Sequence, residues 1–367
     1  MKVAIVHDYL NQYGGAEKTL ESLLEIYPNA VIYTGIYNPN AVSEQIKKHT
    51  IISPTNSLLL SFPKYFTFLM PLIFESFDLR EYDLIISSGT AWAKSVITDA
   101  DQLHIAYIHT PPRFLYGYSV ESQIRDKWYF KPIVSVLDAF LRVWDFAAAQ
   151  RPDFLIANSI EVRNRIEKFY KRGATVIYPP VEVNYKNKET EILKKIDKKY
   201  YLALGRLAAY KNFDLLIETF RNLDTTLVIA GTGPEEERLK YLCPKNVIML
   251  GKVTEIEKHE LLENCLGLLF PVVDEDFGIV PVEALAHGKP VLAHRSGGVI
   301  ETIRENIDGE FFTEINTESL KVAFTKFDNN ISSQKYNPTE IKKRAALFDK
   351  ETFKNKFVSF VEEKKNA

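Results

Sequence analysis

Two glutamates eight positions apart, Glu275 and Glu283, flank a glycine turn in the stretch DEDFGIVPVEALAHGKPVLA. The preceding run CLGLLFP predicts a strand, and Pro281 suits the first turn of a following helix because its missing N–H costs nothing there. We therefore expect Glu275 in a loop at the carboxyl edge of a sheet and Glu283 in the first helical turn. Carboxylates accept sugar hydroxyls, and the N–H groups at Gly278 and Ile279 would attract anions. The combination suits a ligand with both hydroxyls and phosphates, such as a nucleotide sugar.

A purely structural interpretation of the two carboxylates stands beside this one. Glu283 would then only stabilise the N-terminus of its own helix, by about 0.3–1 kcal/mol. Glu275 would be a solvated loop charge. The spacing of the two residues does not separate these interpretations, so the other loops that follow predicted strands matter.

Two cations follow another predicted strand, in YLALGRLAAYKNFDLLIETF. The strand ends at Gly205, Arg206 and Lys211 come next, and a helix is expected from Asn212. Cations at the carboxyl edge of a sheet can clamp a diphosphate, Arg bidentately and Lys as a point charge. The alternative is that both are ordinary surface cations.

The first half of the chain offers a glycine pair and a histidine after its strands. Gly14 and Gly15 turn the chain into a helix in HDYLNQYGGAEKTLESLLE, where they would allow close approach to a phosphate or sugar. This is not the GxGxxG fingerprint, so NAD is not expected. In HIAYIHTPPRFLYGY, His109 ends a strand and Arg113 follows two prolines. His109 could bond a sugar hydroxyl or titrate near neutrality; a structural, hydrogen-bonded histidine is the alternative.

These loops belong to a regular alternation of strands and helices. Short apolar runs, buried on both faces, alternate with amphipathic stretches, which is typical of βαβ units and parallel sheets. We expect strands at Val3–His7, Ala30–Thr34, Leu84–Ser87, His104–His109, Phe154–Ala157, Thr175–Tyr178, Tyr201–Leu204, Thr226–Ala230, Val247–Leu250, Gly267–Phe270 and Val291–Ala293.

The strands divide into two doubly wound, Rossmann-like domains joined by a charged linker, an α/β fold. The expected bounds are 1–180, a linker at 181–199, 200–345, and a C-terminal helix at 346–367 that returns to the first domain. Ligands bind open α/β sheets at the carboxyl ends of the strands. We therefore expect the functional residues to face a central cleft between the domains.

Composition limits the possible partners. The 367 residues suit two domains, and a net charge of −2 gives no reason to expect nucleic acid. Two cysteines in no metal-like spacing favour a reducing compartment. No signal peptide or membrane-spanning run is evident, so we expect a cytoplasmic protein. The aromatic stretch Leu58–Phe77 suits either an interfacial helix that contacts a membrane or a buried helix.

Taken together, these residues resemble glycosyltransferase family 4, retaining enzymes of the GT-B fold. The E-x7-E element of that family resembles Glu275 and Glu283, and its diphosphate-binding cations match Arg206 and Lys211. In the first half, HDYLNQYGGAEKTL, YIHTPPRFLY and ATVIYPPVE resemble mannosyltransferase-like enzymes of bacterial surface-polysaccharide assembly. That subgroup commonly uses GDP-mannose.

The resemblance implies a role for each candidate residue. Arg206 and Lys211 would neutralise the leaving diphosphate, Glu283 would hold the ribose, and Glu275 would hold the donor sugar. The remaining implied donor contacts are the backbone of Phe277, Gly278 and Ile279, Val253 near the base, Gly14 and Gly15 at the phosphates, and His109 at the sugar. The catalytic set is then His109, Arg206, Lys211 and Glu275, with Arg113 a candidate on the acceptor side.

The implied reaction is transfer of a hexosyl group, with mannose from GDP-mannose favoured, to a saccharide or lipid-linked saccharide. The first domain would bind the acceptor and the second the nucleotide sugar. No cofactor and no metal are expected, because the two cations could replace a metal's charge. Two other functions stay open: a GT-B nucleotide-sugar epimerase and a non-catalytic carbohydrate-binding protein.

Overall fold

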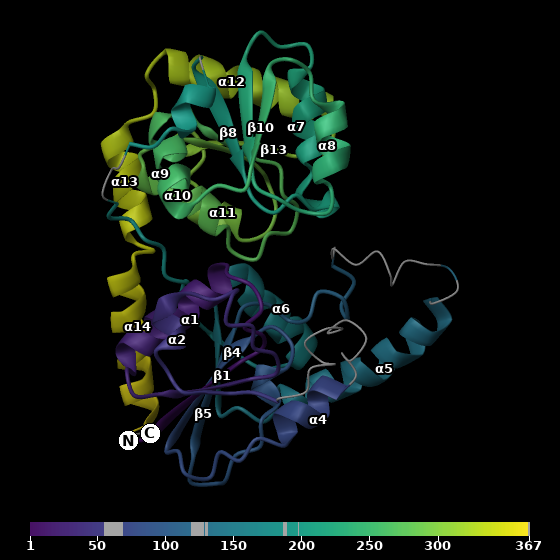
Figure 1. Ribbon diagram of the computed structural model, residues 1–367, viewed down its shortest axis with the longest axis vertical. Helices are drawn as coiled ribbons and strands as arrows, with labels where there is room; N and C mark the ends of the chain where they lie inside the picture. The colour runs from purple at the N-terminus through teal and green to yellow at the C-terminus, as the bar shows by residue number, and fades with distance from the viewer. Residues whose placement is uncertain (55–68, 119–127, 129–130, 186–188, 197, 366–367) are drawn as a thin grey trace. The chain divides into compact units, whose positions relative to one another are not determined.

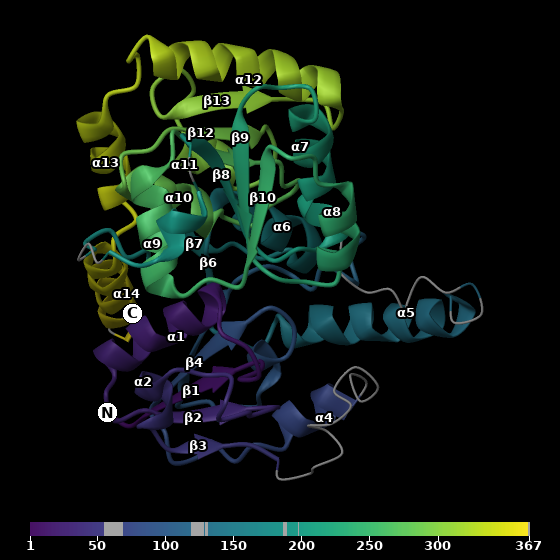
Figure 2. The same cartoon turned by 45° about the horizontal axis from the view of Figure 1, so that its top comes forward.

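The computed structural model describes residues 1–54, 69–118, 128, 131–185, 189–196 and 198–365 (Figures 1 and 2). The chain forms two compact units. Unit 1 contains Met1–Pro180 together with Glu351–Ala367, and unit 2 contains Val181–Lys350. The final helix therefore belongs to the unit that also holds the N-terminus.

Unit 1 is built on a seven-stranded parallel sheet with the order β3-β2-β1-β4-β5-β6-β7. The order reverses direction between β1 and β4, which makes the carboxyl ends of these two strands the topological switch point. The strands are β1 (Val3–His7), β2 (Val31–Thr34), β3 (Ile51–Ile52), β4 (Leu84–Gly89), β5 (Leu103–Ile108), β6 (Phe154–Ala157) and β7 (Thr175–Val176).

Helices cover both faces of this sheet, which explains why its strands are apolar throughout. In β1, Val3 and Ile5 join one core cluster while Ala4 and Val6 join another on the opposite face. Figure 1 shows α1 and α14 on one side of the sheet and α4 on the other. The helices of unit 1 are α1 (Gly15–Ile26), α2 (Glu44–Lys47), α4 (Met70–Glu75), η2 (Ala93–Ser95), α5 (Lys131–Ala148), α6 (Ile160–Tyr170) and α14 (Lys350–Lys365).

Unit 2 has a six-stranded parallel sheet with the order β10-β9-β8-β11-β12-β13. Here the order reverses between β8 and β11, so the loops after these strands leave the sheet at its switch point. The strands are β8 (Tyr200–Leu204), β9 (Thr226–Ala230), β10 (Val247–Gly251), β11 (Leu268–Phe270), β12 (Val291–His294) and β13 (Gly309–Phe312). The helices are η3 (Ile192–Lys195), η4 (Ala209–Lys211), α7 (Phe213–Phe220), α8 (Glu236–Leu242), α9 (Glu255–Asn264), α10 (Ile279–Ala286), α11 (Val299–Thr302), α12 (Thr317–Ser332) and α13 (Pro338–Ala346).

The aromatic stretch Leu58–Phe77 lies partly outside the described residues. Its described part contains α4, in which Met70 and Phe74 are buried in the core of unit 1 and Leu72 is exposed. The described portion is thus largely a core element. Among the residues that the structure describes, no helix has the length and apolar character needed to cross a bilayer.

Candidate active site

Three neighbouring strands of unit 2 end on glycines with positive φ. These are Gly205 after β8 (φ +151°), Gly231 after β9 (φ +143°) and Gly251 at the end of β10 (φ +70°). A Cβ on Gly231 would lie 1.8 Å from the carbonyl oxygen of Gly205, so glycine is required there. The close approach holds the first two loops together at the carboxyl edge of the sheet.

The loop after β8 carries both predicted cations. Arg206 is exposed directly after Gly205, and Lys211 ends the short helix η4. Asn212, with a φ of +54°, donates from Nδ2 to the carbonyl oxygen of Pro271 at 3.0 Å. Because Pro271 follows β11, this bond ties the loops on the two sides of the switch point together.

Lys211 and Glu275 meet across that switch point. The Nζ of Lys211 lies 2.6 Å from Oε2 of Glu275, and the two side chains are 14% and 22% exposed. Burial alone would lower the pKa of Lys211, but the neighbouring Glu275 carboxylate outweighs it and the pKa is raised. Lys211 is therefore a cation at neutral pH. Two residues that the sequence places 64 positions apart form one charged centre.

The loop that carries Glu275 is held by the turn after β12, which the sequence analysis did not single out. Gly298 donates its N–H to the carbonyl oxygen of Glu275 at 2.7 Å, and the N–H of Asp274 donates to Ser296 Oγ at 2.9 Å. A Cβ on Gly297, whose φ is +65°, would lie 2.2 Å from the Glu275 carbonyl oxygen. The two glycines of the SGG sequence were the available signal, since a close backbone approach explains such a pair.

The helix α10 begins at the predicted glycine turn. Gly278 is its N-cap with a φ of +91°, and Ile279 is its first residue. Pro281 falls in the first turn as expected, but Glu283 lies beyond it, and the first turn contains no acidic residue. The expectation for Glu283 was thus wrong by about one position. Because the helix dipole acts mainly within the first turn, stabilisation of the helix N-terminus no longer accounts well for Glu283.

Glu283 is 4% exposed and needs a partner for its charge. Lys258 supplies one, with Nζ 2.8 Å from Glu283 Oε1. Lys258 lies on α9, whose N-cap is Thr254, and Val253 directly precedes that N-cap in the loop after β10. Lys258 was missed because a lysine within EIEKHELL looks like any helix-surface cation. Phe277, next to Gly278, is buried and packs on Phe348, so its side chain belongs to the interior of unit 2.

In unit 1, His109 follows β5 beside the switch point. Its Nε2 lies 3.0 Å from Ser88 Oγ, and its backbone N–H donates to the carbonyl oxygen of Gly89. Burial, together with the nearby His7, lowers the pKa of His109 to about 4 despite the acidic Asp8 and Glu17. His109 is therefore neutral at physiological pH. The structure favours a hydrogen-bonding role and argues against titration near neutrality.

The other candidates of unit 1 lie in loops at the same edge. Gly14 donates its N–H to Glu17 Oε2 at 2.7 Å and precedes Gly15, the first residue of α1. Its backbone is extended (φ −154°), and a Cβ there would make only an ordinary contact at 3.4 Å, with Glu17 Oε2. The fold itself therefore does not require glycine at this position. Arg113 is half-buried, and its carbonyl oxygen accepts the N–H of Tyr116 and Tyr118.

Asp8 explains how the switch point of unit 1 is built. Directly after β1, its carboxylate accepts the backbone N–H groups of residues 90–93, at 2.7 to 2.9 Å, and the Thr90 hydroxyl at 3.0 Å. Burial opposes ionisation, but these bonds and the nearby Lys94 leave the pKa of Asp8 lowered. With its oxygens so fully used, Asp8 is a structural carboxylate that fixes the chain after β4.

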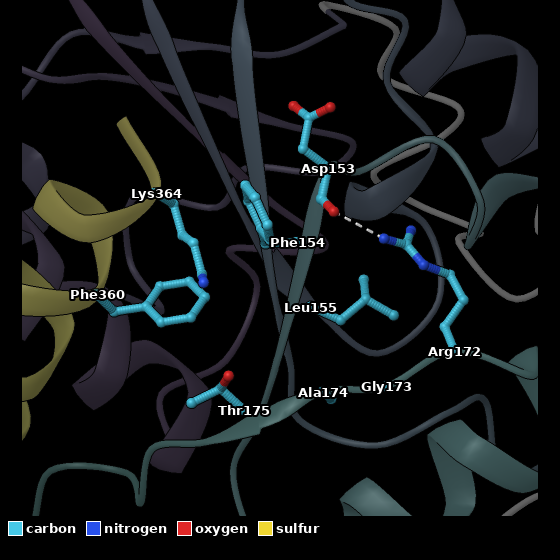
Figure 3. Close-up of a pocket in the computed structure, with 9 residues that line it drawn as sticks. All are labelled: Asp153, Phe154, Leu155, Arg172, Gly173, Ala174, Thr175, Phe360 and Lys364. Atoms are coloured by element: carbon cyan, nitrogen blue, oxygen red, sulfur yellow. Dashed lines mark hydrogen bonds between the residues drawn. The ribbon is translucent and has the colours of Figure 1, made fainter. Parts of the chain in front are cut away.

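A cavity in unit 1 lies at the other end of the strands. It has a volume of about 470 Å³ and is lined by residues at the beginnings of β6 and β7 and by Phe360 and Lys364 of α14 (Figure 3). Arg172 at its wall donates to the carbonyl oxygens of Ala149, Pro152 and Asp153. The polar candidates all follow strands, so this cavity is separate from them.

Comparison with known proteins shows what the second unit is similar to. Residues 185–344, which lie within unit 2, match the family model described as Glycosyl transferases group 1. An uncharacterized glycosyltransferase of Methanocaldococcus jannaschii is 28% identical over 187 residues, 50% of this chain and 52% of that protein. An alpha-1,3/1,6-mannosyltransferase of Kluyveromyces lactis is 25% identical over 369 residues, 82% of this chain and 71% of that protein. The chain spans only about half the length of several curated relatives that it matches.

Solved structures confirm the fold. HepE of Anabaena, solved in complex with UDP and glucose, superposes with a TM-score of 0.71 and 18% identity, covering 99% of both chains. The expectation of two doubly wound, parallel-sheet domains of the GT-B class is confirmed. The match of residues 185–344 and the relatives named as glycosyltransferases support the expectation of a glycosyltransferase. The roles of the site residues stay predictions, as does the absence of a metal requirement.

Proposed function

We propose that this protein is a retaining glycosyltransferase that moves a hexosyl group, with mannose from GDP-mannose favoured, to a saccharide or lipid-linked saccharide. The proposed setting is bacterial surface-polysaccharide assembly, with the protein in the cytoplasm and in peripheral contact with the inner face of the membrane. The relative named as a mannosyltransferase supports the choice of sugar. The bound UDP and glucose of HepE make UDP-glucose the donor to compare.

The observation that carries the proposal is the charged centre at the switch point of unit 2. Arg206 and Lys211 stand in the segment after β8. Lys211 lies 2.6 Å from Glu275, which stands in the loop after the neighbouring strand β11. A sugar diphosphate needs cations at its phosphates and an acceptor of hydrogen bonds at its sugar hydroxyls. These three side chains supply both within one edge of one sheet.

The proposed chemistry assigns each residue to a separate task. Arg206 and Lys211 neutralise charge as it develops on the leaving diphosphate, an electrostatic contribution that is often large in catalysis. Glu275 holds the donor sugar. Glu283 holds the ribose, and its hydrogen bond to the ribose replaces its ion pair with Lys258. His109, neutral, accepts or donates a hydrogen bond at a sugar hydroxyl. Transfer with retention then proceeds by front-face attack, in which the leaving phosphate takes the proton of the acceptor.

A donor screen without acceptor tests the proposal. We expect the chain to hydrolyse one nucleotide sugar slowly and Arg206→Ala to reduce that rate by orders of magnitude. The matched control is Arg221→Ala, which removes an exposed arginine of unit 2 that is paired with Glu218. Conversion of the donor to an epimer would instead establish the epimerase alternative. Binding of free sugar without any binding of GDP or UDP would establish the non-catalytic one.

A further inference from the structure

We propose that the outward face of α5 is the surface by which this protein docks on an anionic lipid bilayer. The inference rests on the proposed peripheral contact and names the surface that makes it. Helix α5 exposes a set of large apolar side chains that a soluble surface rarely gathers on one helix. Their exposed fractions run from 41% to 72%: Ile133, Val136, Leu137, Phe140, Val143 and Phe146.

These side chains form one stripe. At about 100° per residue along a helix, the six fall within an arc of roughly 180°. The opposite side of the helix packs on unit 1, where Asp145 is fully buried and Leu141 half-buried. The apolar surface therefore faces outward and is not a misassigned core face. Leu72 of α4 is likewise exposed, at 65%.

One end of α5 is anchored, and the other projects. Asp145 lies 2.6 Å from Lys94 Nζ and accepts the hydroxyl of Tyr116, while Trp144 Nε1 donates to Glu75 of α4 at 3.1 Å. All three contacts involve the carboxyl half of the helix. In both views the amino end of α5 extends away from the sheet of unit 1 (Figures 1 and 2). A rigidly held helix that projects its apolar stripe can lie in the interface of a bilayer.

The charges beside the stripe select a bilayer over a second copy of the chain. The two acidic residues of α5 are Asp145, which is buried, and Asp138, which is half-buried. Its exposed charges are Lys131 and Arg142, which on the helix wheel border the apolar arc on one side. Such an edge attracts anionic headgroups. Two copies packed through this face would bring basic edges together with no exposed acidic residue of α5 to pair with them.

Vesicle sedimentation of the full chain tests the surface. Wild type should bind vesicles containing phosphatidylglycerol more tightly than vesicles of phosphatidylcholine alone. The double variant Phe140→Ser, Val143→Ser should lose about tenfold or more in partitioning, because two exposed anchors no longer enter the apolar layer. The matched control, Tyr241→Ser with Val322→Ser, removes two apolar side chains of unit 2 that are 91% and 68% exposed and should bind as wild type does.

Charge and oligomeric state complete the test. Lys131→Glu should weaken binding to the anionic vesicles only, whereas Lys335→Glu, an exposed lysine of unit 2, should not. Unchanged sedimentation of the α5 double variant, or no binding by wild type, would overturn the inference. So would a wild-type dimer that the double variant converts to a monomer, since a second copy would then cover the stripe. Donor hydrolysis measured on the same samples reports on the proposed transfer separately.

Discussion

Glu275→Gln should strengthen the binding of a nucleoside diphosphate while weakening sugar transfer. In the structure Glu275 holds the ammonium of Lys211 at 2.6 Å. A diphosphate must share that ammonium with the carboxylate, and the carboxylate also repels the phosphates. The glutamine keeps the size and a carbonyl acceptor but removes the competing charge. The same change takes away the charged acceptor proposed for the donor sugar, so the two measurements should move in opposite directions.

The size of the effect follows from how far the pair is buried. Exposed ion pairs contribute about 0–1 kcal/mol, and loss of one partner of a fully buried pair costs about 3–5 kcal/mol. With 14% and 22% of the two side chains exposed, we expect an intermediate release of roughly 1–1.5 kcal/mol. GDP or UDP should then bind up to about tenfold tighter. Lys211→Met removes a charged hydrogen bond of about 1.5–3 kcal/mol and should weaken binding by roughly 10- to 150-fold.

Isothermal titration calorimetry with GDP and UDP measures both variants. The pair Lys343 and Glu340 on α13 is the matched control, because its atoms lie 2.7 Å apart but its side chains are 68% and 47% exposed. Lys343→Met and Glu340→Gln should leave nucleotide affinity unchanged. If Glu275→Gln weakens nucleotide binding as Lys211→Met does, the two residues act as one structural unit and the proposed competition is wrong.

Three further outcomes are expected. Gly14→Ser should keep the melting temperature, since serine is a good N-cap and its Cβ would make only an ordinary contact. It should nevertheless impair transfer, because the added side chain would block the close approach of a phosphate or sugar to the backbone. Gly231→Ala, whose Cβ would lie 1.8 Å from the carbonyl oxygen of Gly205, should instead fail to reach a stable fold in thermal melts. Lys94→Met leaves Asp145, 2.6 Å away and 0% exposed, without its cation and should destabilise unit 1 by about 3–5 kcal/mol in denaturant titrations. The pKa of His109 is lowered to about 4 from an ordinary 6.5, so the unfolded chain takes up the proton at higher pH than the folded chain does. The stability that is present above about pH 6.5 is therefore lost as the pH falls toward 4. His109→Gln should flatten this pH dependence of the unfolding free energy, and an equal slope in both proteins would contradict the assignment.

Much of the fold could be predicted because its strands are buried on both faces and read as short apolar runs. The strand β13 escaped prediction because it contains Glu310, which is 1% exposed. That carboxylate is compensated by Lys326, Asn330 and Tyr336, which lie 16 to 26 residues further along the chain. No local sequence pattern indicates such distant partners, so a strand that contains a buried acidic residue is easily taken for a loop. The strand β3 is only two residues long and offers no pattern to detect.

The candidate site likewise has local features that the sequence predicts and contacts between distant residues that it does not predict. A glycine after a strand, a cation in the next loop and a proline in a first helical turn are local features, and the sequence places them correctly. Which side chain touches which depends on strand order. Lys211 and Glu275 meet because β8 and β11 are neighbours in the sheet, although three helices and three strands separate the two residues along the chain. Lys258 finds Glu283 for an equally non-local reason.

Both proposed donor carboxylates are thus paired with a lysine inside unit 2. This arrangement has a consequence for how a nucleotide sugar would be recognised. Each lysine compensates the charge of a carboxylate that is largely removed from solvent, and each must give up part of its bond when ligand arrives. A ligand with phosphates alone would bind Lys211 and weaken its ion pair with Glu275, and a free sugar would do the reverse. Only a molecule that joins phosphate to sugar hydroxyls compensates both members of such a pair, which favours the intact donor over either of its fragments.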